Sequence, residues 1–154
     1  MRRLTMHMTD MRSETTIAHG LLATLSGTSP ATGNIVDVRD YGAATFALIT
    51  GTVADAGDTA GITFVVEESD TTADADFSAV ADADLVGTEA GLAVTADGSD
   101  DTAVGSIGYI GTKRYVRVVA TGTTGTDATL AGVWILQKPR YAPMGDAADE
   151  IAAT

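Results

Sequence analysis

The chain of 154 residues contains no cysteine and only two histidines. Without cysteine it has no disulfides and no thiolate ligands for a metal. Both histidines, His7 and His19, lie near the N-terminus, so the body of the chain lacks the ligands that zinc or haem requires. We therefore expect the protein to bind no cofactor.

Aromatic residues are also scarce, with three Phe, four Tyr and one Trp in a chain that is 45% hydrophobic. Much of the hydrophobic fraction is Ala, so the core has to be built mainly from Val, Ile, Leu and a few rings. The length is that of one domain of ordinary size. A thin core of this kind favours stabilisation by neighbouring molecules.

The sequence has no long hydrophobic run. No segment approaches the roughly 20 apolar residues that span a bilayer. No continuous apolar stretch follows Arg2 and Arg3, because Met, His, Thr and Asp residues interrupt it. The N-terminus therefore does not support a secretory signal. We expect a soluble protein that is synthesised in the cytoplasm and has no membrane partner.

Cations are few: nine Lys and Arg stand against 21 Asp and Glu, giving a net charge of −12. No Lys or Arg occurs between Asp40 and Thr112. Such a surface repels a polyanion, which argues against nucleic acid as a partner. The acidic balance fits either a well-solvated surface or one complementary to a basic partner, and both interpretations stay open.

What the chain does contain is a series of short β-branched and aromatic runs separated by turns rich in Gly and Asp. Seventeen Gly residues and the absence of an amphipathic helical segment disfavour a helical fold. The spacing predicts an all-β protein, a single antiparallel β-sandwich or jelly roll. We expect an N-terminal arm and lead-in over residues 1–32, the sandwich over 33–143 and an acidic, Ala-rich tail over 144–154.

Alternation along these runs predicts the core. The residues in phase are Phe46, Leu48, Phe64, Val66, Val116, Val118, Val133 and Ile135. Trp134 alternates to the opposite face from Val133 and Ile135, so something must cover each face of this strand. For Trp134 we favour a core position over a role as a binding anchor.

The cations concentrate in one stretch, GYIGTKRYVRV from Gly108 to Val118. A run that ends at Ile110, a turn at Gly111-Thr112 and a second run over 115–121 predict a β-hairpin. The hairpin then carries Lys113, Arg114 and Arg117. These side chains either form an interface or pair across strands with local Asp and Glu, and the sequence does not decide between the two.

Catalytic patterns are weak. Ser106 lies in GSIG rather than in a G-x-S-x-G elbow, and the carboxylate pair Glu67-Glu68 lacks the aromatic platforms and amides of a glycosidase. We therefore expect no enzymatic activity. Calcium remains an open alternative at two Asp-rich segments, although neither has the EF-hand spacing. These segments contain Asp74 and Asp76, and Asp97, Asp100 and Asp101.

The stretch over 108–118, together with VWILQKPRYAP over 133–143, resembles small proteins of tailed phages and prophages encoded among head genes. Looser similarity covers 62–68 and 77–85. The resemblance implies a virion structural protein, a decoration or vertex protein on the capsid surface. Its expected partners are the major capsid protein and further copies of itself. The alternative is a tail or adhesion module that recognises a host-surface glycan.

Residues 1–16 lack the apolar periodicity needed to fold alone. We expect them to become ordered only against a neighbouring subunit, the alternative being a frayed terminus. Cations of the arm and of the predicted hairpin are the expected partner-binding residues. They are Arg2, Arg3, Arg12, Lys113, Arg114 and Arg117.

Overall fold

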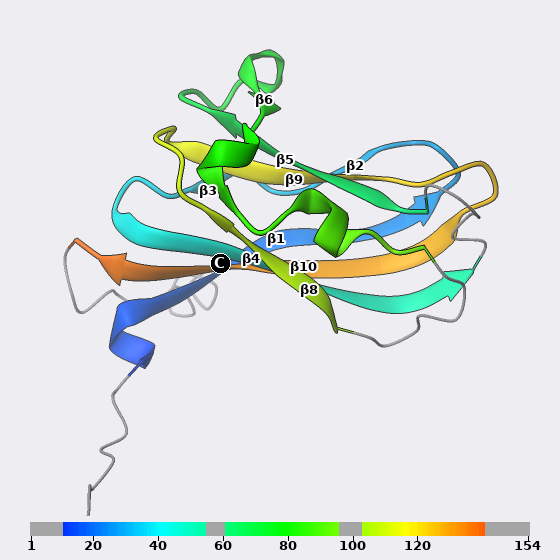
Figure 1. The fold of residues 1–154 in the computed structure, drawn as a ribbon, viewed down its shortest axis with the longest axis horizontal. Coiled ribbons are helices and arrows are strands. Elements are labelled where there is room, and N and C mark those ends of the chain that lie inside the picture. The colour runs from blue at the N-terminus through cyan, green and yellow to red at the C-terminus, as the bar shows by residue number, and fades with distance from the viewer. Residues whose placement is uncertain (1–10, 55–60, 96–102, 141–154) are drawn as a thin grey trace, which may run out of the picture.

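The computed structural model describes residues 11–54, 61–95 and 103–140, which form two packed antiparallel sheets. Figure 1 shows these two layers, with β1, β10 and β4 side by side in one and β5 beside β9 in the other. The prediction of an all-β sandwich is confirmed. In the part of the chain that the structure describes, no helix is long and apolar enough to cross a membrane.

The first layer, sheet A, has the order β1-β10-β4-β8-β7. Its strands are β1 (Thr15–Ser26), β10 (Asp127–Pro139), β4 (Tyr41–Ala54), β8 (Ala103–Tyr109) and β7 (Leu85–Val86). The second layer, sheet B, has the order β2-β9-β5-β6, with β3 also paired to β9. Its strands are β2 (Ala31–Thr32), β9 (Tyr115–Thr121), β5 (Thr63–Ser69), β6 (Ser78–Ala79) and β3 (Val36–Asp37). Four 3-10 turns are described: η1 (Arg12–Glu14), η2 (Asp74–Asp76), η3 (Asp82–Asp84) and η4 (Glu89–Leu92).

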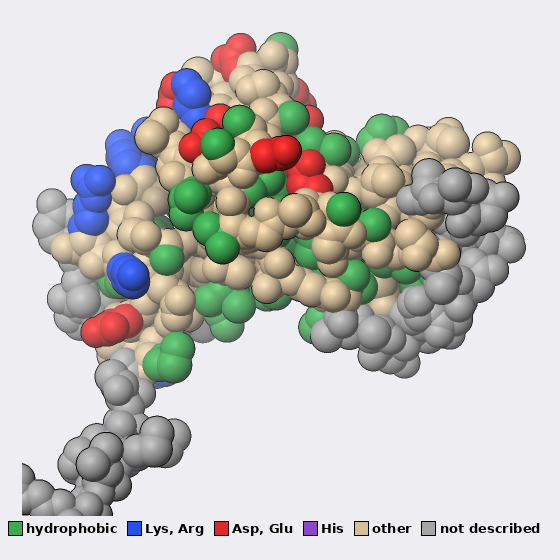
Figure 2. All heavy atoms as spheres, in the orientation of Figure 1, with side chains coloured by type: hydrophobic (Ala, Val, Ile, Leu, Met, Phe, Trp, Pro, Cys, Tyr) green, Lys and Arg blue, Asp and Glu red, His purple; other side chains and the backbone are tan. Residues whose placement is uncertain are grey.

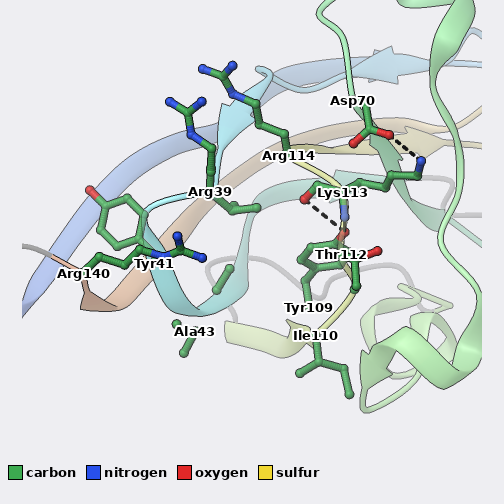
Figure 3. A pocket seen from close by; sticks show the side chains of 14 residues that line it. Arg39, Tyr41, Ala43, Asp70, Tyr109, Ile110, Thr112, Lys113, Arg114 and Arg140 are labelled. Carbon is green, nitrogen blue, oxygen red and sulfur yellow. Dashed lines mark hydrogen bonds and ion pairs between the residues drawn. The ribbon is translucent and has the colours of Figure 1, made fainter.

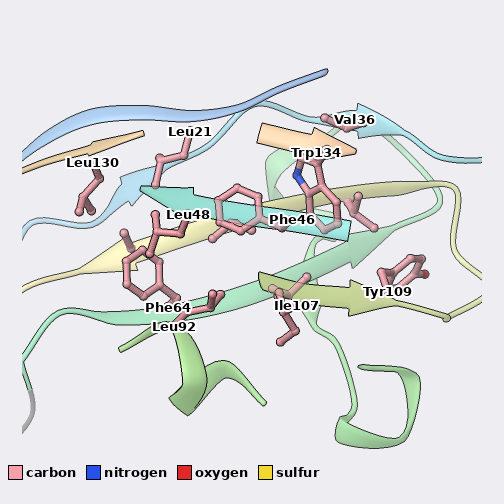
Figure 4. Close-up of a cluster of buried hydrophobic side chains, with 14 of the residues drawn as sticks. Leu21, Val36, Phe46, Leu48, Phe64, Leu92, Ile107, Tyr109, Leu130 and Trp134 are labelled. Atoms are coloured by element: carbon pink, nitrogen blue, oxygen red, sulfur yellow. The ribbon is translucent and has the colours of Figure 1, made fainter. Parts of the chain in front are cut away.

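The core lies between the sheets, where every second residue of the long strands points inward (Figure 4). Phe46 and Trp134 are cross-strand partners and are fully buried, with ring centroids 5.5 Å apart. Two glycines make room for these rings. A Cβ on Gly132 would collide with the Phe46 ring, and one on Gly20 would lie 2.8 Å from Phe46 Cε2. The glycines thus let a thin core accommodate its largest side chains.

Six of the eight predicted core residues are buried: Phe46, Leu48, Phe64, Val66, Val116 and Val118. The prediction is wrong for Val133, which is 37% exposed, and for Ile135, which is only half-buried. Both belong to β10 and point away from the core, because Trp134 between them points into it. The expected core position of Trp134 is confirmed.

The expected boundary at residue 33 is too late. β1 begins at Thr15 and pairs with β10 along its whole length, with an irregularity between His19 and Leu21. Leu21 and Leu25 of β1 are buried in the core. Residues 15–26 are therefore a full strand of the sandwich, where a lead-in was expected. Residues 1–10 and the expected tail over 144–154 lie outside the described residues.

The predicted hairpin is also wrong. β8 pairs with β4 and β7 in sheet A, whereas β9 pairs with β5, β2 and β3 in sheet B. The segment 110–114 therefore crosses from one sheet to the other. A turn signal indicates that the chain reverses, but it does not specify whether the next strand joins the same sheet.

Candidate functional site

The crossing segment forms one wall of a hollow of about 520 Å³ at one end of the sandwich (Figure 3). The rest of the wall comes from the ends of strands and the segments next to them: Val38 and Arg39 before β4, residues 41–44 at the start of β4, Asp70 after β5, Tyr109 at the end of β8 and Arg140 after β10. Four cations line it: Arg39, Lys113, Arg114 and Arg140. Figure 2 shows Lys and Arg side chains gathered at one end of the visible face. We call this site the cationic hollow.

Lys113 is held in the cationic hollow by Asp70 and Tyr109. Its Nζ lies 2.5 Å from Asp70 Oδ2, and its backbone N–H donates to Tyr109 Oη at 2.9 Å. Tyr109 Oη in turn donates to Glu68 Oε2 at 2.6 Å. The hydrogen bond from Lys113 lowers the pKa of Asp70, and the same contact raises the pKa of Lys113. Burial, followed by the hydrogen bond to Glu68, raises the pKa of Tyr109.

Arg114 forms the second ion pair at this site. Its Nε and Nη2 lie 2.9 and 2.7 Å from Asp37 Oδ2, and its guanidinium lies 4.7 Å from the Tyr115 ring centroid. Burial tends to raise the pKa of Asp37, whereas the hydrogen bonds from Arg114 and from the Arg39 N–H lower it. The hydrogen bonds and the nearby positive charges outweigh burial, so the pKa of Asp37 lies below its ordinary value. Arg114 therefore joins the crossing segment to β3.

Arg39 and Arg140 are less constrained. Arg39 Nε lies 3.9 Å from Asp40 Oδ1, at the limit of an ion pair, and half of its side chain is exposed. The backbone N–H of Arg140 donates to Asp40 O at 2.8 Å, and its guanidinium has no acidic partner among the described residues. These two guanidinium groups are thus the least committed cations of the hollow, and a guanidinium is suited to bidentate hydrogen bonding with a carboxylate or a phosphate.

Arg117 differs from the other cations because it is nearly buried, with 9% of its side chain exposed. It lies on β9 between Glu67 and Asp74, each at 2.7 Å, and its guanidinium stacks on the Phe77 ring at 4.1 Å. Burial opposes its charge, but the bonds to the two carboxylates outweigh this effect and raise the pKa of Arg117. Its visible role is to fasten residues 74–77 to sheet B.

The structure therefore gives each cation of the predicted hairpin an acidic partner within the chain, as the intrachain alternative supposed. The cations are not free, yet Lys113 and Arg114 still line the hollow. Among the other predicted partner-binding residues, Arg12 lies in η1, and Arg2 and Arg3 lie outside the described residues. The sequence prediction missed Arg39 and Arg140, which only the fold brings to the hollow.

The structure also places most of the residues that were considered for calcium binding or catalysis. Within residues 11–54, 61–95 and 103–140, no group of three or more His, Cys, Asp or Glu is arranged to hold a metal ion. Asp74 pairs with Arg117, and Asp76 accepts a hydrogen bond from Thr71 Oγ1. His19 Nδ1 lies 2.8 Å from the amide nitrogen of Asn34. Asp97, Asp100 and Asp101 lie outside the described residues.

Comparison of the chain with protein-family models, with curated proteins and with solved structures gives no match.

Proposed function

We propose that the protein is a non-enzymatic structural component of a tailed-phage head, a decoration or vertex protein bound to the capsid surface. One observation carries the proposal. The two segments that resemble phage head-gene proteins lie apart in the chain, and both contribute cations to the cationic hollow. Lys113 and Arg114 come from the first segment, and Arg140 comes from the second.

The charges support binding to an acidic group on the capsid. In a chain of net charge −12, the cationic hollow gathers four of the nine Lys and Arg residues. Asp70, Asp37 and Asp40 hold Lys113, Arg114 and Arg39 in position without filling the hollow. An acidic side chain of a capsid subunit would pair with Arg39 and Arg140, the two cations least committed within the chain. Acidic surfaces elsewhere on the protein would resist other orientations.

The mechanism is binding, not turnover. A single carboxylate contact at an exposed site is weak, but a capsid repeats it at every equivalent position. If neighbouring copies also touch one another, the separate contacts act together and the effective affinity rises without any new contact on the capsid. The protein thereby reinforces the lattice.

Capsid shells that lack the protein provide the test. The purified full chain is added to such shells, and the bound fraction is measured by co-sedimentation. We expect Arg39→Gln and Arg140→Gln each to weaken binding by a factor of about three to five, because each removes one exposed ion pair worth up to about 1 kcal/mol. Lys138→Gln is the matched control, since it removes the same charge from an exposed residue outside the hollow. Equal binding by all three variants and the parent would contradict attachment through this site.

A further inference from the structure

The outer face of sheet A is unusual for an acidic protein because it carries no Asp, Glu, Lys or Arg over the middle of its three longest strands. A sheet with one solvated face normally alternates apolar residues inward with polar residues outward. Here Ile, Leu, Val and Ala share the outward positions with Thr, one His and one Gln. These positions are Ile17, His19, Leu22, Thr24, Ala43, Thr45, Ala47, Ile49, Thr129, Ala131, Val133, Ile135 and Gln137.

The register places the larger of these side chains in rows across the sheet. Ile17 on β1 is opposite Ile135 on β10, and Leu22 is opposite Ala131, which is opposite Ile49 on β4. Cross-strand partners point to the same side of a sheet, so each row forms continuous apolar surface. Leu22 is 69% exposed, Ile17 65% and Ile49 53%. A contiguous exposed apolar surface of this kind marks an interaction site.

The size of the face matches a protein interface. β1, β10 and β4 have 12, 13 and 14 residues, and β8 adds seven on one side. With a rise of about 3.3 Å per residue and strands about 4.8 Å apart, these strands present roughly 700 Å². Stable, specific complexes bury about 800 Å² on each partner. A second sheet of the same dimensions would cover the face.

Charge decides which partner fits. Any Asp, Glu, Lys or Arg of a partner laid on this face would lose its water without gaining a countercharge, which is costly. The partner must therefore present an uncharged apolar surface of similar extent. The outer face of sheet A in a second copy is such a surface. Pairing these faces also leaves the acidic groups of both chains at the periphery, where salt screens charges more than about 10 Å apart.

We propose that two copies of this protein pack sheet A against sheet A in an isologous dimer, with Leu22, Ile49 and Ile17 in the contact. In such a pairing the same residues are supplied by both chains, and the two sheets lie about 10 Å apart as in an ordinary β-sandwich. The contact goes beyond capsid attachment and requires no capsid, so failure of either proposal leaves the other standing.

Sedimentation velocity on the purified full chain, over a wide concentration range, tests the proposal. We expect the parent to form a dimer. Leu22→Lys should weaken dimerisation at least about tenfold, because each copy then brings an unpaired charge to the contact. Val65→Lys is the matched control: Val65 is an exposed apolar strand residue on the outer face of sheet B. It should dimerise as the parent does.

A second variant, Ile49→Thr, keeps a β-branched side chain suited to a strand while removing apolar surface from the same row. We expect it to weaken the dimer less than Leu22→Lys does, and to melt as the parent does at concentrations where both are monomeric. A parent that stays monomeric at every concentration, or that assembles as a trimer, would overturn the proposal. So would a folded Leu22→Lys or Ile49→Thr that dimerises as the parent does, or a Val65→Lys that dissociates equally.

Discussion

Tyr109, the last residue of β8, donates a hydrogen bond across the sandwich to Glu68 of β5 at 2.6 Å. The bond joins sheet A to sheet B at the point where the chain crosses between them. The same oxygen accepts the backbone N–H of Lys113. One phenol therefore fixes both the end of the sandwich and the wall of the cationic hollow.

Tyr109→Phe should lower the free energy of unfolding by about 1 to 2 kcal/mol, since it leaves a carboxylate and a backbone N–H without their partner. Urea denaturation at neutral pH measures the change. Tyr115→Phe is the control, because the Tyr115 ring stacks with Arg114 and its hydroxyl has no hydrogen bond among the described residues. Equal losses in the two variants would show that the Tyr109 hydroxyl does not join the sheets.

The raised pKa of Tyr109 predicts a pH dependence. Above the ordinary tyrosine pKa of 10.0 the unfolded chain loses this proton while the folded chain keeps it. Proton loss then favours unfolding, so stability falls as pH rises above about 10. The fall should be shallower in Tyr109→Phe than in the parent. Parallel stability curves for the two proteins above that pH would refute the assignment.

Gly132→Ala should destabilise the protein by about 1 to 3 kcal/mol, because the added methyl group meets the buried Phe46 ring. Gly91→Ala is the matched control, since its new methyl group has Thr88 Oγ1 at 3.8 Å as its nearest contact. Thermal unfolding compares the two. In a Phe46→Leu background the cost of Gly132→Ala should shrink, and a cost that persists undiminished would mean that the clash lies elsewhere.

Arg117 and Arg114 should differ in how much their ion pairs contribute to the free energy of unfolding. Arg117→Ala should cost about 2 kcal/mol, because it leaves the partly buried Glu67 unpaired and removes the contact with Phe77. Arg114→Ala should cost less than about 1 kcal/mol, because its pair with Asp37 is solvent-exposed. Urea denaturation of both variants gives the comparison, and a larger loss for Arg114→Ala would contradict it.

Acid should weaken the pairing of Asp37 with Arg114. The pKa of Asp37 is lowered in the folded chain, so this carboxylate contributes stability above its ordinary pKa of 3.8 and loses that contribution as pH falls through the lower folded value. Asp37→Asn should therefore be less stable than the parent at neutral pH and approach it in strong acid. A difference that is constant with pH would show that Asp37 titrates as in the unfolded chain.

Strand composition was enough to predict an all-β sandwich and most of its core, because the inward runs around Phe46 and Phe64 alternate cleanly. The local pattern could not predict which residues of β10 point into the core. Val133 and Ile135 are as apolar as their inward neighbours, because the outer face of sheet A is itself apolar. β1 was missed because His19, Gly20 and several Thr residues obscure its alternation around an irregular register.

The candidate site was predicted only in part. The cations of 113–117 stand out in an acidic sequence, but their partners Asp70 and Asp37 lie far away in the chain. Arg39 and Arg140 reach the same hollow because β4 and β10 are neighbours, with Tyr41 opposite Pro139. Pairing over such distances depends on the order of strands in the sheets, which local periodicity does not encode.

Cryo-electron microscopy of the virion tests the central claim most directly. We expect density for the β-sandwich on the outer surface of the capsid, with the cationic hollow of each copy facing an acidic group of a capsid subunit. Sandwich density confined to the tail or its fibres, or a head without such density, would contradict the account.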